Sequence, residues 1–238
     1  MSKAIELINL TKKYKNNRGI ENISLTVGEG EIFGFLGPNG AGKTTAMKIM
    51  TGLMTPDSGD VLIEGYSIVS DYEKAMANVG CIIESVAMFP YLTAEENLKL
   101  CARFYGGAES RRDDCLERTG MLRFKKERVK NFSLGMRQRM GISMALVSEP
   151  RILILDEPLN GLDVEGMVDM RNLFKSLAKT KKTTVFISSH LIHDVELTCD
   201  RVGIVYGGKL INIESMDEIL KSYSTLENYY LSEVGENE

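Results

Sequence analysis

The chain has 238 residues, 43% of them hydrophobic, and a formal net charge of −4. This length can bury one large α/β core, with or without a smaller inserted lobe, so we expect no second independent domain. The acidic balance offers no global basic field, which argues against nucleic acid as a main partner. No apolar run approaches the ~18 residues of a membrane span, and the start of the chain lacks the apolar region of a signal peptide.

The four cysteines form no C-x-x-C pair and have apolar or helical surroundings. They are Cys81, Cys101, Cys115 and Cys199. Reduced thiols in the core of a cytosolic protein explain this distribution better than disulfides or metal ligands do. We therefore expect four free core thiols.

Alternating apolar residues at the start of the chain predict antiparallel strands on either side of a turn rich in Lys, Asn and Gly. They are Ile5 and Leu7 before the turn, then Ile23, Leu25 and Val27 after it. Tyr14 lies next to this turn. An aromatic residue there is most often a half-buried edge residue, and stacking against a nucleobase is the functional alternative.

A glycine-rich stretch follows the apolar run 31–36 and precedes apolar residues at helical spacing. It consists of Gly37, Pro38, Asn39, Gly40, Ala41, Gly42, Lys43, Thr44 and Thr45. Glycines let the backbone turn successive N–H groups inward, and a helix start attracts anions. Lys43 is then expected to reach the β- and γ-phosphates of a nucleotide, and the Thr44 hydroxyl to ligate Mg²⁺. The flanking strand and helix make an accidental glycine-rich turn the weaker interpretation.

The segment 88–150 has helical periodicity, and we expect a helical lobe there. Before it, the run 80–84 is typical of a buried strand and ends in Glu84. Within the lobe, Ser133 precedes a helix as a natural N-cap. One interpretation is a cap and nothing more. The other is an anion site, because the Ser133 hydroxyl, the amides exposed by Gly135 and the helix dipole converge at one helix start.

Two carboxylates, Asp156 and Glu157, follow four apolar residues, 152–155, that are typical of a buried strand. Strand ends in an open parallel sheet are where ligands bind, so both acids should face the phosphate loop. Asp156 fits the Mg²⁺ shell, and Glu157 fits a base that orients and polarises water. The alternative, two acids that simply close a strand, is weak beside an intact phosphate loop.

His190 follows a further buried strand, 183–189. It lies three residues before His193, but no third ligand is spaced to form a metal site with them. A hydrogen bond from His190 to the γ-phosphate is the better hypothesis. The remaining chain predicts a closing hairpin across Gly207 and Gly208, then one short amphipathic helix and a frayed acidic tail.

Together these motifs resemble the nucleotide-binding subunit of an ATP-binding cassette (ABC) transporter over almost the whole chain. Gly37–Thr45 is similar to the family's Walker A loop, Ser133–Gln138 to its signature and Ile152–Glu157 to its Walker B motif. Leu162 with Asp163 is similar to its D-loop, His190 to its switch histidine and Tyr14 to its adenine-stacking aromatic. The resemblance implies ATP and Mg²⁺ as cofactors and places Asp163 in the nucleotide site.

The resemblance also implies an α/β fold of the P-loop NTPase type. We expect a mainly parallel core sheet with an N-terminal antiparallel part, in about 1–87 and 151–215. The helical subdomain at about 88–150 is inserted into this core, and a short helix and tail cover 216–238. In the family two subunits dimerise head to tail, and each signature closes on the ATP held by the partner's Walker A loop. A homodimer in the ATP-bound state also makes physical sense here, because the helix-start anion site adds charge stabilisation that the loop alone leaves incomplete.

Two departures from the common pattern are similar to the bacitracin and lantibiotic resistance branch of the family. Most members carry Gln where this chain has Glu84, and most read L-S-G-G-Q where this chain reads Phe132–Met136. A Glu at that position adds charge near Mg²⁺, so Glu84 joins Thr44 and Asp156 as a candidate metal-site residue. The implied function is to power the export of a peptide antibiotic, with a non-transport ATP sensor as the alternative.

The implied partner is an integral membrane permease, which would hold the protein at the cytoplasmic face of the cell membrane. In the family's layout Glu84 and the segment 86–91 border a cleft that receives a helix of the permease. Phe89 and Tyr91 are suited to anchor such a helix, and packing against the lobe is the alternative. A guanine-nucleotide switch is excluded because the chain has no N-K-x-D element.

Overall fold

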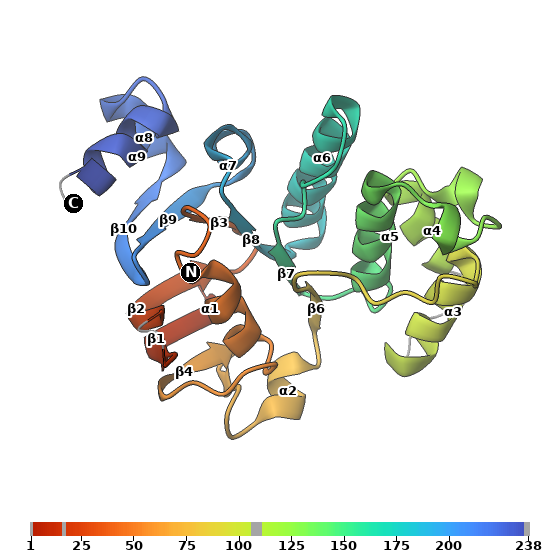
Figure 1. The fold of residues 1–238 in the computed structure, drawn as a ribbon, viewed down its shortest axis with the longest axis horizontal. Helices are drawn as coiled ribbons and strands as arrows, with labels where there is room; N and C mark the ends of the chain where they lie inside the picture. The colour runs from red at the N-terminus through yellow and green to blue at the C-terminus, as the bar shows by residue number, and fades with distance from the viewer. Residues whose placement is uncertain (1, 16–17, 106–110, 236–238) are drawn as a thin grey trace.

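The computed structural model describes residues 2–15, 18–105 and 111–235 and contains two β-sheets (Figure 1). The first is a four-stranded antiparallel sheet with the strand order β2-β1-β4-β5. Its strands are β1 (Lys3–Lys13), β2 (Gly19–Gly28), β4 (Ser58–Ile63) and β5 (Tyr66–Ser67). The predicted antiparallel start of the chain is confirmed, since β1 pairs with both β2 and β4. Residues 16–17 of the connecting turn lie outside the described residues.

The second sheet has six strands in the order β10-β9-β3-β8-β7-β6. They are β3 (Ile32–Leu36), β6 (Val79–Ile82), β7 (Ile152–Asp156), β8 (Thr184–Ser189), β9 (Arg201–Tyr206) and β10 (Lys209–Ser215). Every pairing is parallel except that of β10 with β9. β3, β7 and β8 are buried along their whole length, as expected for central strands with both faces covered.

Alternate side chains of the central strands enter two different cores. Phe33 and Phe35 of β3 pack with the antiparallel sheet and the first helix, whereas Ile32 and Leu36 pack with the helices on the other face. This follows from the two-residue period of a strand. The six-stranded sheet therefore separates the two cores, and its strand ends are held rigidly from both sides.

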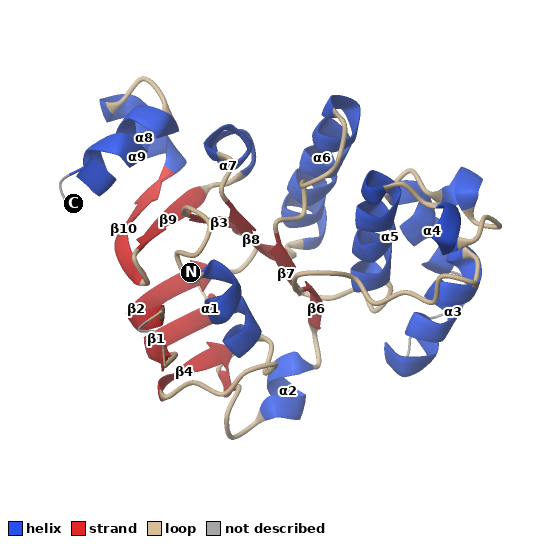
Figure 2. Ribbon diagram, viewed as in Figure 1, coloured by secondary structure: helices blue, strands red, loops and turns tan. Residues whose placement is uncertain are grey.

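Helices lie beside the two sheets and at both ends of the molecule (Figure 2). The core carries α1 (Lys43–Met50), α2 (Tyr72–Met76), α6 (Val164–Lys181) and α7 (Ile192–Thr198). A helical lobe beside the edge strand β6 is built from α3 (Ala94–Tyr105), α4 (Arg111–Arg118) and α5 (Leu134–Leu146). At the opposite edge, α8 (Met216–Ser222) and α9 (Leu226–Gly235) contact β10.

Two details differ from the sequence-based expectations. The lobe is not helical throughout, because the stretch between α4 and α5 holds only the 3₁₀ turns Leu122–Phe124 and Val129–Asn131 among its described elements. The chain also forms two helices after β10 where we expected one, and Leu226 and Tyr229 of α9 are buried. Burial of these side chains gives the second helix a packing reason that its weak periodicity does not reveal. Residues 236–238 lie outside the described part.

Candidate functional site

The phosphate loop connects the end of β3 to the start of α1. Gly40 and Gly42 have positive φ angles of 85° and 100°, which glycine adopts without strain. Gly37 has no such positive φ angle. This position needs glycine for another reason, because a Cβ there would lie 2.2 Å from the Val205 carbonyl oxygen. The loop thus needs two glycines for their backbone angles and one for close packing.

Lys43 is buried in the loop, with 5% of its surface exposed. Its Nζ donates to the carbonyl oxygens of Gly37 at 2.7 Å and Pro38 at 3.2 Å, and lies 3.6 Å from Glu157 Oε1. Burial lowers the pKa of the Lys43 ammonium, and the nearby carboxylates oppose this shift. A bound phosphate would add further negative charge beside this partly desolvated ammonium and stabilise it.

Asp156 is the centre of a hydrogen-bonded group at the adjoining strand ends. Its Oδ2 accepts from the Thr44 hydroxyl at 3.0 Å, and its Oδ1 accepts from the Ser188 hydroxyl at 2.5 Å. Ser188 also accepts from the Glu157 amide at 3.0 Å. Sequence reasoning missed Ser188, although the parallel register of β7 and β8 places it directly opposite Asp156. Hydroxyl and carboxylate oxygens of this kind are the donor set that Mg²⁺ prefers.

Glu157 and His190 face each other beside this group. His190 Nδ1 lies 3.0 Å from Glu157 Oε1, but not in hydrogen-bonding geometry. The backbone of Glu157 has a φ of 49°, a left-handed conformation that costs a non-glycine residue about 1 kcal/mol or more. Such a strained residue persists only where its surroundings hold it. Here the side chain is aimed at both Lys43 and His190.

A pocket of about 720 Å³ opens over the phosphate loop. Tyr14 lines its outer side, 38% exposed, with its hydroxyl 3.4 Å from Thr45 Oγ1 and 3.2 Å from Met54 Sδ. Lys15 and Arg18 also line the pocket, and sequence reasoning missed both. A flat aromatic beside two cationic side chains is suited to hold a base and its phosphates.

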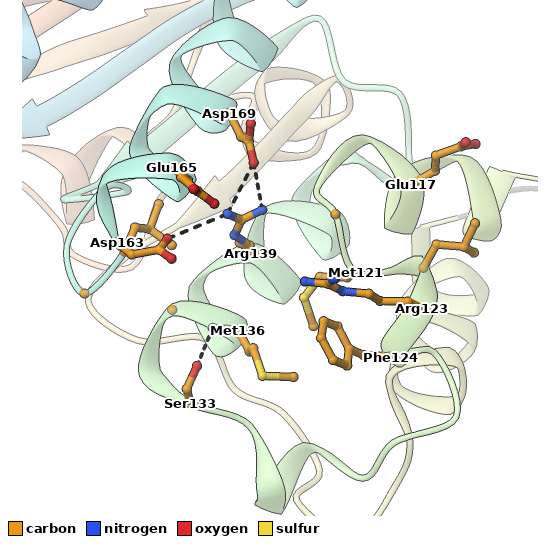
Figure 3. Close-up of a pocket in the computed structure, with 15 residues that line it drawn as sticks. Glu117, Met121, Arg123, Phe124, Ser133, Met136, Arg139, Asp163, Glu165 and Asp169 are labelled. Carbon is orange, nitrogen blue, oxygen red and sulfur yellow. Dashed lines mark hydrogen bonds and ion pairs between the residues drawn. The ribbon is translucent and has the colours of Figure 1, made fainter.

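Ser133, Gly135 and Asp163 lie in a second pocket of about 920 Å³ (Figure 3). The predicted cap is confirmed, because Ser133 Oγ accepts from the Met136 amide at 3.2 Å at the start of α5. Asp163 caps α6 in the same way, accepting from the Gly166 amide at 2.9 Å. The two pockets have no lining residue in common among the described residues. Ser133 and Gly135 therefore line a pocket other than that of the phosphate loop, although Gln138 at the end of the signature donates to the Glu157 carbonyl at 3.4 Å.

Arg139 joins the walls of this second pocket and was missed by sequence reasoning (Figure 3). Its guanidinium donates to the Thr119 carbonyl at 3.3 Å and to Asp169 at 3.3 and 3.4 Å. Glycines lie on both sides of it: a Cβ on Gly120 or Gly166 would come within 2.8 or 2.7 Å of the guanidinium nitrogens. This contact connects the helical lobe, the signature helix α5 and helix α6.

Glu84 lies apart from the phosphate loop pocket. It is exposed, has a φ of 62°, and its Oε1 accepts from Lys48 Nζ of α1 at 2.7 Å.

The burial of the four cysteines differs in part from expectation. Cys115 and Cys199 are buried and Cys101 is half-buried, but Cys81 is exposed. The prediction of a core thiol is wrong for Cys81, because β6 is an edge strand with one open face.

Across the described residues, no helix combines the length and apolar character needed to cross a bilayer.

Comparison with known proteins identifies the family. The family model of the ABC transporter matches residues 20–160. The chain is 40% identical to the bacitracin transport ATP-binding protein BcrA of Bacillus licheniformis, over 98% of this chain and 76% of that protein. It is 38% identical to the lantibiotic transport ATP-binding protein SrtF of Streptococcus pyogenes, over 87% of this chain and 89% of that protein.

Solved structures agree with this assignment. An ATP-binding subunit of an ABC transporter superposes with a TM-score of 0.86 at 28% identity, over 97% of this chain and 99% of that one. The dimeric, post-hydrolysis state of the ATP-binding cassette MJ0796 with ADP and Pi gives a TM-score of 0.81 at 28% identity, over 89% and 98% of the two chains. The chain therefore belongs to the ABC transporter family, as an ATP-binding subunit with the cassette fold.

Proposed function

We propose that the protein is a Mg²⁺-dependent ATPase that powers a membrane transporter for a peptide antibiotic, a lantibiotic or a related compound. Relatives named for bacitracin transport, lantibiotic transport and linearmycin resistance support this substrate class. The cell would gain self-immunity or resistance by exporting the compound. The observation that carries the ATPase proposal is the convergence of Lys43, Thr44, Asp156, Glu157 and His190 at one edge of the sheet.

Thr44 and Asp156 would hold Mg²⁺, because both present oxygen donors at one point and are already 3.0 Å apart. When bound, the ion neutralises charge on the β- and γ-phosphate oxygens. Lys43 neutralises further phosphate charge from inside the loop. Glu84 would contribute to the metal site only after leaving its ion pair with Lys48, so we assign it an outer position.

Glu157 is the proposed base. It would orient the attacking water and take its proton, while His190 hydrogen-bonds the γ-phosphate. The 3.0 Å separation of His190 Nδ1 from Glu157 Oε1 supports a shared task for the two side chains. Tyr14 would stack on adenine from the outer side of the pocket.

Two copies of the chain would complete each site. Ser133, Gly135 and Asp163 line a different pocket from the phosphate loop, which supports their supply to the nucleotide by a partner subunit. The dimeric cassette among the structural relatives, which holds ADP and Pi, supports a dimer that forms around bound nucleotide, and we propose a homodimer in the ATP-bound state. Exposed amides at the start of α5 would then stabilise the γ-phosphate of the partner's ATP.

A permease would hold this dimer at the cytoplasmic face of the membrane. The cleft between β6, α3 and α5 has a volume of about 360 Å³ and is lined by Val86, Ala87 and Tyr105, among others. Phe89 and Tyr91 do not line this cleft but follow Ala87 in the chain, and they are 61% and 75% exposed, which argues against the alternative that they pack into the lobe. Asn97 fixes this segment by two hydrogen bonds with the Phe89 backbone.

The decisive experiment measures ATP hydrolysis by the purified protein with Mg²⁺, with excess chelator, and in the variant Glu157→Gln. We expect Mg²⁺-dependent turnover that falls by two or more orders of magnitude in Glu157→Gln, the usual scale for a positioned base, while nucleotide binding is kept. The control is Glu227→Gln, which changes an exposed glutamate of α9. Parental turnover in Glu157→Gln would refute the assigned base, and nucleotide binding without any turnover by the parent would favour the ATP sensor.

A further inference from the structure

Helix α7 begins two residues after His190, and few interactions within the helix itself stabilise it. It is only seven residues long, and its N-cap, Leu191, makes no side-chain capping bond. Short helices are marginal without tertiary contacts. His190 lies between the buried strand β8, which ends at Ser189, and α7, so its position depends on both elements.

One contact of α7 with α6 is an ion pair. Arg171 NH1 of α6 lies 3.4 Å from Oδ1 of Asp194, in the first turn of α7. The two side chains are only 16% and 11% exposed. A charge pair in such surroundings is difficult to break, because the partner left behind would be a desolvated single charge.

The same aspartate lies against the turn that carries the proposed base. Asp194 and Thr198 of α7 line a small cavity that residues 157–160 also line. Because His190 connects β8 to α7, a shift of α7 along this turn would change the separation of His190 from Glu157. At the far end of α7, Glu196 accepts from the Leu226 amide at 2.6 Å, which fixes that end to α9.

We propose that Arg171 and Asp194 are a positioning pair that holds His190 against Glu157. They do not touch nucleotide themselves and act through the placement of α7. The same helix α6 begins at the Asp163 cap and contacts Arg139 through Asp169, so the D-loop, the signature helix and the switch histidine share one rigid support. This inference rests on the proposed role of His190 in ATP hydrolysis.

The test compares Asp194→Asn, Arg171→Gln and Arg171→Lys with the parent in steady-state ATP hydrolysis and thermal unfolding. Loss of the pair should lower kcat about tenfold and change KM for ATP by less than about twofold, because the phosphate loop is untouched and misplacement by a fraction of an ångström affects the chemical step. Arg171→Lys keeps the charge and should recover most of kcat. The control is Lys181→Met, which breaks the exposed ion pair with Glu149 at the other end of α6.

A double-mutant cycle with His190→Ala separates positioning from general destabilisation. Once His190 is absent, Asp194→Asn should lower kcat no further. An equal further loss of kcat in the His190→Ala background would overturn the inference, as would a lowered melting temperature with unchanged kcat at 25 °C. Parental turnover in His190→Ala would instead refute the proposed role of the histidine. If Asp194→Asn does not fold, Arg171→Gln undergoes the same cycle.

Discussion

Individual residues at the site owe their properties to desolvation as much as to their chemical type. Lys43 is the clearest case, because burial lowers its pKa while Glu157 and Asp156 oppose the shift. Its ammonium is held by two loop carbonyls at 2.7 and 3.2 Å. The loop is thus preorganised for an anion, which reduces the cost of binding one.

The cysteines allow a test of residue environments by pH. Burial raises the pKa of Cys101 and Cys115 to about 11, and it also raises the pKa of the buried Cys199 and, although its residue is exposed, that of Cys81. The thiolate is the reactive form, so it appears only as the pH approaches these raised values. Under native conditions we expect an alkylating reagent to modify Cys81 first, because its side chain is exposed. Cys199 should react last.

The labelling rate of Cys101 should continue to rise by roughly tenfold per pH unit up to about pH 10. Mass spectrometry of digested protein, sampled over time at each pH, measures the four rates separately. A plateau near pH 8.5 would show an ordinary thiol and contradict the burial. Labelling of the unfolded protein in denaturant serves as the control, since all four cysteines should then react alike.

Among the structural elements, the signature helix α5 is joined to α6 by the guanidinium of Arg139, in addition to a shared apolar core. Arg139→Ala removes the donor to the Thr119 carbonyl and leaves Asp169 without its partner. We expect a loss of about 1–3 kcal/mol of unfolding free energy, the usual cost of leaving a buried group such as the Thr119 carbonyl unsatisfied, while the exposed Asp169 adds little. Denaturant unfolding measures this loss, and Arg103→Ala on the exposed side of α3 is the control.

Arg139→Lys should fall between the parent and Arg139→Ala, because an ammonium cannot reproduce the fork of the guanidinium. The two contacts diverge from one side chain toward different elements. Equal stability of all three proteins would mean that the helical lobe is held to α6 by apolar packing alone.

The segment after β6 offers a second prediction for an element. Phe89→Ala and Tyr91→Ala should leave the melting temperature and basal ATP hydrolysis unchanged, because both side chains are largely exposed. They should weaken capture of the permease from detergent extracts and lower resistance to a peptide antibiotic. Phe104→Ala is the matched control, an aromatic residue of α3 that is 84% exposed. Unchanged capture by the double variant would contradict the docking role.

How much of these elements the sequence predicts depends on whether the signal is local. Lys43, Thr44 and Asp156 belong to short patterns with a fixed order of strand, loop and helix, so their meeting point follows from the topology of a parallel sheet. The cap at Ser133 is local in the same sense. Ser188 is different, because its role depends on the register between β7 and β8.

Other contacts depend on tertiary packing and leave no sequence signal. Arg139 contacts Asp169, 30 residues away, and Arg171 contacts Asp194, 23 residues away. Arginines at such positions are ordinary solvent-facing residues in most helices. The stretch before Ser133 was predicted as helix because its apolar spacing is helical, but its backbone bonds instead with residues 90–95.

At the scale of the whole molecule, the separation of the two pockets predicts that function requires two chains. Subunits with Lys43→Ala and subunits with Ser133→Arg should each be inactive as homodimers. In the mixed dimer both lesions fall in one composite site and the other site stays intact. Hydrolysis assays on mixtures of the two proteins should therefore recover part of the parental activity.

The control for this mixture is Lys43→Ala combined with Glu157→Gln subunits, which leaves each of the two sites with one lesion and should recover nothing. The heterodimer must be shown to form, for example by purification through two different affinity tags. Complete failure of complementation in such dimers would contradict a shared site, or reveal that both sites must act together.

The left-handed backbone of Glu157 implies a conflict between heat resistance and turnover. The left-handed φ at this position destabilises the folded state by about 1 kcal/mol or more for glutamate, a strain that glycine does not have. Glycine relieves this strain but adds about 0.5–1 kcal/mol of unfolded-chain entropy and removes the carboxylate beside Lys43. Selection for thermostability alone would therefore favour Glu157→Gly, a variant without its base, only where the relieved strain is the larger effect. A substitution of Glu157 that raises the melting temperature would therefore be expected to abolish ATP hydrolysis.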